Sequence, residues 1–215
     1  MTMKRSFEEL REEYSRMSLA EGDLAPNPMD QFKRWYDDAV AQDIPLANAV
    51  TLATVSAEGQ PSARVVLLKD IDHGLVFYTN YQSQKGQELA ANSRASLLFW
   101  WPPLERQVRI LGHCEKVADA MSDAYFATRP RMSNLSALAS DQSRAVPSRD
   151  AMERRVEELA AEHPDAVPRP ATWGGYRLLP SRFEFWQGRR DRLHDRLVYE
   201  PAGEGPDWAI SRLYP

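Results

Sequence analysis

The sequence predicts a mainly β fold with peripheral helices, in which the strands close into a barrel. Between Ala49 and Val117, short segments rich in Val, Leu and aromatic residues alternate with turn residues, which is the pattern of strands. Only one segment among them has the length and the Ser cap of a helix. Strands joined by short turns are typical of an antiparallel meander, and closure into a barrel removes its exposed edges.

The order of these elements follows from the turn and cap residues between them. The strands expected in this part are 49–55, 62–69, 75–79, 95–101 and 106–117, and the later ones are 173–179, 183–186, 196–199 and 208–213. Helices are expected at 29–42, 83–92, 123–128 and 149–162. Because strands come from both halves of the chain, we expect a single domain over 1–215.

An N-terminal helical segment, 1–45, precedes the first strand. Apolar residues recur every three or four positions from Phe7 to Met17, which indicates an amphipathic helix with Arg11 and Tyr14 on one face. This stretch lacks the apolar core of a signal peptide, and no apolar run reaches the length of a membrane span. We therefore expect a cytoplasmic protein without a membrane partner.

Composition narrows the class of protein further. The 215 residues include 27 Lys and Arg against 31 Asp and Glu, so the net charge of −4 provides no general basic surface for nucleic acid. The single cysteine, Cys114, excludes an internal disulfide and is expected to be a buried thiol. Four scattered histidines make a metal site unexpected.

The common nucleotide and hydrolase motifs are absent from the sequence. No glycine-rich Rossmann turn or P-loop occurs, and no G-x-S-x-G elbow indicates a hydrolase. The remaining possibility is a cofactor that is bound by cationic side chains on strands.

Two segments carry such cations. Arg64 and Lys69 flank four aliphatic residues, and their five-residue separation places them on opposite faces of an ideal strand, so one ligand reaches both only at a bend or a strand end. Lys85 lies in the first turn of the helix expected at 83–92, where free N–H groups favour a phosphate. A buried strand with solvated ends is the competing interpretation for the first segment.

A third cationic segment lies near the C-terminus. If 192–196 is extended, Arg192, His194 and Arg196 share one face, which favours an anionic or electron-rich ligand. A solvated turn, with the arginines paired to Asp191, Asp195 or water, is the interpretation that the spacing alone slightly favours, because surface ion pairs are common.

Several motifs together resemble the pyridoxine 5′-phosphate oxidase family, in order and at compatible spacing from about Arg11 to Pro215. The residues that carry the resemblance are Arg64-Val65-Val66-Leu67-Leu68-Lys69, Phe77-Tyr78-Thr79-Asn80, Glu105-Arg106-Gln107-Val108, Tyr125-Phe126 with Arg129-Pro130-Arg131, Gln142-Ser143, Trp173-Gly174-Gly175-Tyr176, Glu184-Phe185-Trp186-Gln187-Gly188 and Arg192-Leu193-His194-Asp195-Arg196. The agreement of separate motifs makes this resemblance specific.

The resemblance implies an FMN-binding split β-barrel that forms a homodimer, with FMN between the two subunits. It implies FMN contacts from Arg64, Val65, Val66, Leu67, Leu68, Lys69, Tyr78, Thr79, Gln84, Lys85, Gln107, Gln142, Ser143, Trp186 and Arg196. It implies substrate contacts from Lys69, Tyr125, Arg129 and Ser133 at the phosphate, from Arg192 and His194 at the pyridine ring, and from Arg11 and Tyr14 in a segment that closes over the substrate. Arg192 and His194 are the residues expected to act in catalysis.

The implied reaction is oxidation of pyridoxine or pyridoxamine 5′-phosphate to pyridoxal 5′-phosphate. The C4′ hydride would pass to flavin N5, and O2 would take up the electrons to give H2O2. Gln84 departs from the Arg that the family commonly has at this place, and Leu46 and Asn48 stand where an acidic residue is frequent. The alternatives are a related FMN oxidase of phenazine biosynthesis and a split-barrel protein that binds flavin or pyridoxal phosphate without catalysis.

Overall fold

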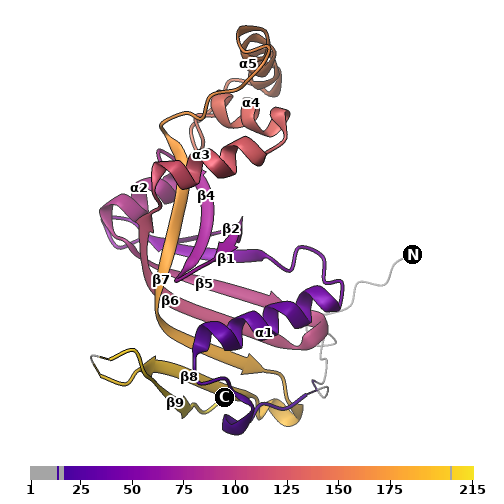
Figure 1. Ribbon diagram of the computed structural model, residues 1–215, viewed down its shortest axis with the longest axis vertical. Coiled ribbons are helices and arrows are strands. Elements are labelled where there is room, and N and C mark those ends of the chain that lie inside the picture. The colour runs from indigo at the N-terminus through magenta and orange to yellow at the C-terminus, as the bar shows by residue number, and fades with distance from the viewer. Residues whose placement is uncertain (1–13, 15–16, 204) are drawn as a thin grey trace. The chain divides into compact units, whose positions relative to one another are not determined.

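The computed structural model describes Tyr14, residues 17–203 and residues 205–215 (Figure 1). The chain forms two compact units. Unit 1 comprises Met1–Asn48, Leu98–Ile110 and Ser181–Pro215, and unit 2 comprises Ala49–Leu97 and Leu111–Pro180. Each unit combines segments that are distant in the sequence, and the assignment of 1–215 to a single domain stays a prediction.

Unit 1 contains the helix α1 (Pro28–Ala41), whose first turn is capped by the side chain of Asn27. Its apolar face forms the core of this unit. The ring of Phe32 lies 4.9 Å from that of Phe99, and Trp35 is also buried. The expected helix at 29–42 is therefore confirmed to within one residue at each end.

The C-terminal strands β8 (Asp195–Pro201) and β9 (Trp208–Arg212) pair antiparallel in the same unit. Tyr199 is fully buried on β8, and its hydroxyl donates to the carbonyl of Ala25 at 2.6 Å. This hydrogen bond fixes the segment before α1 to the C-terminal hairpin.

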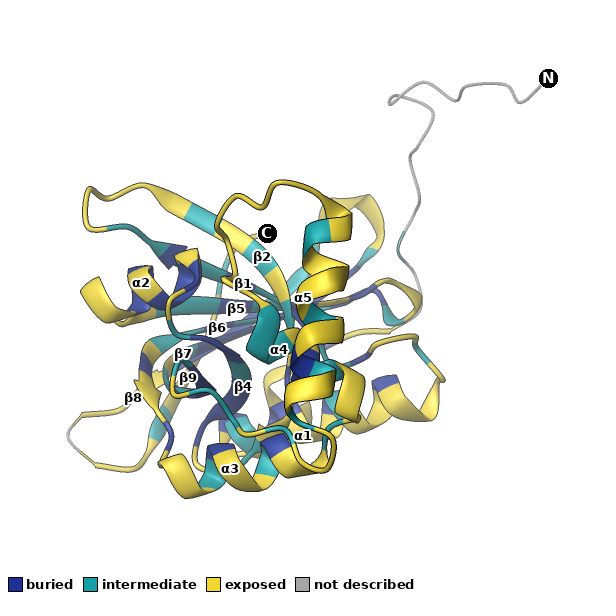
Figure 2. Cartoon of the chain, turned by 90° about the horizontal axis from the view of Figure 1, so that it is seen from above, coloured by how far each residue is buried: buried dark blue, intermediate teal, exposed yellow. Residues whose placement is uncertain are grey.

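Unit 2 begins with the hairpin of β1 (Ala49–Val55) and β2 (Pro61–Leu67). Three further elements follow it in the chain: the short β3 (Asp70–Ile71), β4 (Leu75–Asn80) and the helix α2 (Gln84–Ala91). Unit 2 also holds α3 (Asp119–Thr128), α4 (Arg131–Ala139) and α5 (Arg149–Glu162). Buried residues dominate β4, whereas α5 is largely exposed (Figure 2).

The strands β5 (Arg94–Trp101), β6 (Arg106–Lys116) and β7 (Trp173–Gln187) each contribute residues to both units. Among the described residues, nine strands pair in the order β2-β1-β5-β6-β7-β4-β3, with β8 on β7 and β9 on β8. The expected simple meander is therefore wrong in its order: β4 pairs with β7, a strand about 100 residues later, instead of with β5. Long-range pairing of this kind leaves no local signal in the sequence.

Two other elements differ from the sequence analysis. No helix was expected at 131–139, but Pro130 is the N-cap of α4, because proline is tolerated where a helix begins. The strands expected at 173–179 and 183–186 are one strand, β7, which continues through Pro180. The helix expected from Phe7 to Met17 lies almost wholly outside the described residues.

The thiol of Cys114 is buried on β6, as expected, and burial raises its pKa to about 12. No helix in the described part of the chain has the length and apolar character needed to cross a membrane.

Candidate functional site

A cavity of about 840 Å³ lies within unit 2, a size suited to a cofactor or drug-sized ligand. Its walls come from β2, β4, α2, the segment from α3 to α4 and the start of β7. The lining residues are Arg64, Val65, Val66, Leu67, Lys69, Tyr78, Thr79, Asn80, Lys85, Tyr125, Arg129, Pro130, Met132, Ser133, Ser136, Ala137, Ser140, Gln142 and Trp173. Most of the residues predicted from the sequence for FMN and for the substrate phosphate in this unit thus line one cavity.

Lys85 is a buried cation in the wall of this cavity. Its ammonium lies 3.3 Å from the hydroxyl of Thr79, 3.4 Å from that of Ser83 and 3.2 Å from the side-chain oxygen of Gln142. These partners are neutral, and burial, together with the charge of Arg64, lowers the pKa of Lys85. A buried ammonium with neutral partners favours an anion in the cavity beside it.

Arg64 and Lys69 both line the cavity, although they stand at odd separation. The bend that this requires is present: β2 ends at Leu67, and the N–H of Lys69 donates to the carbonyl of Val76 on β4 at 2.8 Å. The chain therefore changes direction between the two cations. The expectation that one ligand could meet both only at a bend or a strand end agrees with this geometry.

Stacked aromatic rings form another wall. The ring of Tyr78 lies 4.1 Å from that of Tyr125 and 5.4 Å from that of Trp173, both nearly parallel. The guanidinium of Arg129 lies 4.6 Å from the centre of the Trp173 ring, a cation–π contact. Burial lowers the pKa of Arg129, and its Nη1 atom has no hydrogen-bond partner among the described residues. A buried guanidinium nitrogen without a partner on a half-buried arginine favours an anion beside it.

Helix α4 supplies cavity residues that the sequence did not predict. Met132, Ser136 and Ala137 lie on it, and Ser140 follows its end. The apolar spacing of Met132 and Leu135, directly after Pro130, was the available signal for this helix. Ser133 was predicted correctly as a neighbour of Arg129, whose Nη2 donates to the Ser133 carbonyl at 3.0 Å.

Three predicted contacts of this unit do not line the cavity. Leu68 is 4% exposed and belongs to the core, because it faces away from the side on which Lys69 lies. Gln84 is directed instead to Glu88, to which its amide donates at 2.9 Å. Ser143 is an exposed turn residue with a φ of 75°.

A second group of predicted residues lies in unit 1. The ring of Tyr14 lies 5.6 Å from that of Trp186 and 5.7 Å from that of His194. A Cβ at Gly188 would come within 2.7 Å of Tyr14, so glycine is needed at this position for the tyrosine to lie there. Tyr14, Trp186 and His194 therefore form one aromatic cluster, and their contacts with FMN and substrate stay predictions; Arg11 lies outside the described residues.

The protonation of His194 follows from its hydrogen bond. The backbone N–H of Arg189 donates to its Nδ1 at 3.1 Å, and because this N–H can only donate, Nδ1 carries no proton. Burial, and then the positive charge of Arg192, lowers the pKa of the imidazole. His194 is therefore neutral near pH 7, with its proton on Nε2, and acts as a hydrogen-bond donor from that atom.

Of the two interpretations of 192–196, the solvated turn and not the extended segment describes Arg192. Residues Arg190–Arg192 form a 3-10 turn, and Asp191 and Arg192 have φ values of 55° and 60°. Arg192, on the exposed turn, thus does not share the regular strand face expected with Arg196. The left-handed conformation has no cue in this sequence, because neither residue is glycine.

Arg196 is held by a buried carboxylate on β7. Its Nη2 lies 2.7 Å from Glu184, which also pairs with Arg109 and, at 3.7 Å, with Arg182. Glu184 is 3% exposed and is therefore a buried carboxylate that pairs with three arginines. Gln107, the remaining prediction in this unit, is half-buried on β6.

Fold and cavity together define a mainly β protein with a cavity lined by cationic and aromatic side chains, which suits an anionic aromatic ligand. The family model for pyridoxamine 5′-phosphate oxidase matches residues 36–163, and that for the C-terminal dimerisation region of pyridoxine 5′-phosphate oxidase matches residues 173–215. The chain therefore belongs to the pyridoxamine 5′-phosphate oxidase family.

Individual relatives support this membership over nearly the whole chain. A pyridoxine/pyridoxamine 5′-phosphate oxidase of Cupriavidus necator is 58% identical and covers 96% of this chain and 98% of its own. The corresponding protein of Bordetella pertussis is 56% identical and covers 98% and 100%.

Solved structures confirm the split-barrel fold. PhzG from Burkholderia lata, in complex with tetrahydrophenazine-1-carboxylic acid, superposes with a TM-score of 0.88 at 33% identity, covering 94% of this chain and 100% of its own. An FMN-binding protein of Nostoc punctiforme related to pyridoxamine 5′-phosphate oxidase gives a TM-score of 0.70 at 17% identity, covering 93% and 100%.

Proposed function

We propose that this protein is an FMN-dependent oxidase that converts pyridoxine or pyridoxamine 5′-phosphate to pyridoxal 5′-phosphate. The observation that carries the proposal is the cavity of unit 2, in which the buried Lys85 and the half-buried Arg129 provide two cations beside stacked aromatic rings. The relatives at 56–58% identity carry this activity in their names. Vitamin B6 salvage is the corresponding metabolic role.

The residues present fit FMN. Lys85, Thr79 and Gln142 converge on the α2 side of the cavity, where the helix N-terminus favours the flavin phosphate. The backbone and side chains from Arg64 to Leu67 form the adjoining wall. When bound, FMN supplies the redox chemistry, as hydride acceptor from C4′ and electron donor to O2.

The substrate phosphate has its own candidate group. Lys69, Tyr125, Arg129 and Ser133 line the same cavity, and the orphan Nη1 of Arg129 needs an acceptor. Charge-assisted hydrogen bonds to a phosphate are worth about 1.5–3 kcal/mol each. These residues bind the phosphate and so orient the ring for reaction.

Arg192 and His194 act at the pyridine ring in this proposal. Because His194 is neutral with its proton on Nε2, it donates a hydrogen bond to the substrate and does not take up a proton at that atom. Arg192, permanently charged and exposed on the turn, stabilises negative charge as the C4′ hydroxyl loses its proton. For pyridoxine phosphate, the C4′ hydroxyl would release its proton to solvent water, and removal of the C4′ hydride then gives the aldehyde.

The protein works as a homodimer with FMN between subunits. The match of residues 173–215 to a dimerisation region supports this assembly. We also propose a cytoplasmic location and no nucleic-acid partner; cell fractionation tests the location.

The test is the visible spectrum of the purified protein before and after anaerobic addition of pyridoxine 5′-phosphate. Flavin bands that bleach, and return with air as pyridoxal phosphate and H2O2 form, are expected. Flavin bands that persist without bleaching would refute the oxidase activity, and a protein that takes up no FMN would refute the cofactor.

The second candidate is oxidation of a phenazine precursor, which the similarity to PhzG favours. Reduced tetrahydrophenazine-carboxylic acid in place of pyridoxine phosphate tests it in the same assay. The phosphate-binding group around Arg129 argues for the phosphorylated substrate, because a carboxylated tricyclic compound carries no phosphate. A flavin carrier without catalysis would give no turnover with either compound.

A further inference from the structure

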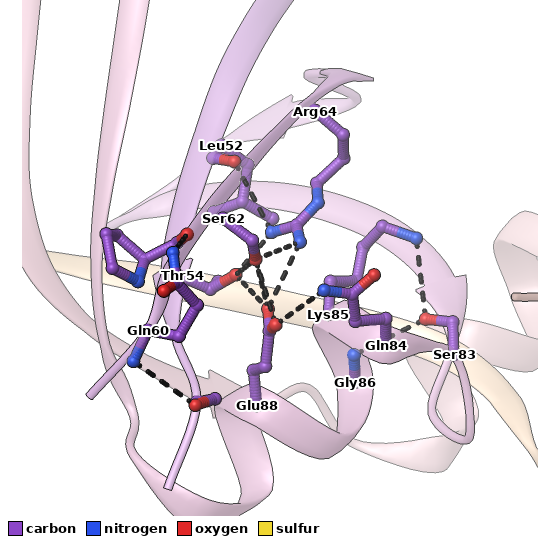
Figure 3. A network of polar contacts seen from close by, with 12 residues as sticks. Leu52, Thr54, Gln60, Ser62, Arg64, Ser83, Gln84, Lys85, Gly86 and Glu88 are labelled. Atoms are coloured by element: carbon purple, nitrogen blue, oxygen red, sulfur yellow. Dashed lines mark hydrogen bonds and ion pairs between the residues drawn. The ribbon is translucent and has the colours of Figure 1, made fainter. Parts of the chain in front are cut away.

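A buried carboxylate, Glu88, lies in a network of polar contacts with Arg64 (Figure 3). Glu88, on α2, is 6% exposed and pairs with Arg64 at 3.1 Å. It also accepts hydrogen bonds from Thr54 at 2.5 Å and from Ser62 at 2.7 Å. Neither the resemblance nor the proposed reaction assigns Glu88 a role.

The network engages both terminal nitrogens of the Arg64 guanidinium. Its Nη2 donates to Ser62 at 2.6 Å and to Glu88, and its Nη1 donates to Thr54. Arg64 nevertheless lines the cavity, and its charge lowers the pKa of Lys85 nearby. Arg64 thus pairs with Glu88 and also faces any anion that binds in the cavity.

Glu88 stays ionised under all ordinary conditions. Burial alone would raise its pKa, but the hydrogen bonds from Thr54, Ser62, Gln84 and Arg64 outweigh burial and hold the pKa at about 2. The negative charge behind Arg64 is therefore a permanent part of the site.

We propose that Glu88 sets the affinity of this site for the phosphate of FMN, by neutralising much of the positive charge that Arg64 would otherwise offer. The inference rests on the proposed function and goes beyond it, since it concerns how tightly the cofactor is held. A fixed negative charge within a few ångströms of an anion opposes its binding, and Arg64 can serve the anion only in competition with the Glu88 carboxylate.

Gln84 completes the arrangement. It lies exposed in the first turn of α2, and its amide donates to Glu88 without adding charge. A cation at this position would neutralise Glu88 and leave Arg64 to the phosphate. With glutamine there, Arg64 is the only cationic side chain paired with Glu88 among the described residues.

The experiment measures the dissociation constants of FMN and of riboflavin, which lacks the phosphate, for the apoprotein by quenching of flavin fluorescence. Glu88→Gln keeps the size of the side chain and removes its charge, and it should tighten FMN binding about tenfold while leaving riboflavin unchanged. Glu157→Gln, an exposed carboxylate on α5, controls for the change in net charge. Glu88→Asp withdraws the carboxylate from Arg64 but keeps its charge, and should tighten FMN binding about two- to threefold.

FMN affinity that is unchanged or weaker in Glu88→Gln overturns the inference. Equal shifts for FMN and riboflavin do the same, because they indicate a general change in the cavity. If Glu88→Gln does not fold, Glu88→Asp decides by the same criteria. If the wild-type protein binds FMN and oxidises the substrate but the Glu88 variants have the same FMN affinity, only this inference is refuted. If the wild-type protein binds no FMN, the proposed function is refuted as well.

Discussion

Lys85 shows how a single buried charge can indicate a ligand. Its ammonium has neutral partners and a lowered pKa, so its charged form lacks the stabilisation that a bound phosphate would provide. A bound phosphate raises that pKa again, so binding of FMN and protonation of Lys85 favour each other.

The consequence is a measurable pH dependence. FMN affinity should be highest below the lowered pKa of Lys85 and should fall as the pH rises through it, since the free protein then loses the proton that the complex retains. Fluorescence titration between pH 7 and pH 10.5 measures this. In Lys85→Arg the side chain stays charged across this pH range, so FMN affinity should decline less. An equally steep decline of FMN affinity in Lys85→Arg would show that Lys85 is not its cause.

Arg192 and His194 give a second prediction at this scale. Arg192→Ala or His194→Ala should lower kcat/KM about 100-fold, because each removes a group that the proposed function places at the reacting part of the substrate. The flavin content and the melting temperature should stay close to those of the wild type. Loss of flavin with unchanged turnover per bound flavin would remove both residues from the reaction.

Glu184 gives a third prediction, on stability. Glu184→Gln should lower the free energy of unfolding by about 2–4 kcal/mol, because Arg109, Arg182 and Arg196 would lose their shared buried partner. Urea denaturation measures it. Glu200→Gln, which removes an exposed partner of Arg182 only, is the matched control and should cost less than about 1 kcal/mol.

At the residue scale, the sequence predicted which residues line the cavity better than it predicted backbone conformations. Lys69, Lys85 and Arg129 line one cavity as expected, because their motifs are local. The geometry of Arg192 was not predictable, since a left-handed φ at a non-glycine residue depends on the surrounding structure. Glu88 was missed because its partners lie 24 to 34 residues away, across the β1–β2 hairpin.

Among the elements, β6 and β7 approach each other most closely at Gly112. A Cβ there would lie 2.1 Å from the carbonyl oxygen of Leu179, and backbone cannot move aside as a flexible side chain can. Gly112→Ala should therefore destabilise the protein by about 1–3 kcal/mol. Gly22→Ala, where nothing lies within 4 Å, is the control; thermal unfolding of both variants decides, and equal melting temperatures would contradict the packing argument.

Most elements were predictable because their signals are local. The helix α5 begins after its cap Ser148 and matches the expected bounds, and β1 matches residue for residue. The pairing of β4 with β7 was not predictable, because it joins distant segments whose apolar patterns would fit several partners. The continuity of β7 through Pro180 likewise depends on its neighbours.

For the whole molecule, the candidate site residues fall into two sets. Arg64, Lys85 and Arg129 belong to unit 2, and Trp186 and His194 belong to unit 1. If FMN lies between two subunits, dissociation of the dimer should release it. Flavin retention should therefore fall with dilution in parallel with the dimer fraction, measured by fluorescence and sedimentation velocity; full retention in a monomer would contradict a shared site.

The position of Cys114 has a consequence for an enzyme that makes peroxide. The reactive form of cysteine is the thiolate, and burial raises the pKa of Cys114 to about 12, so the unreactive thiol prevails at neutral pH. Burial also keeps peroxide from the sulfur. The one cysteine of the chain is thereby shielded from the oxidant released at each turnover, and the protein avoids self-inactivation by sulfenic acid formation.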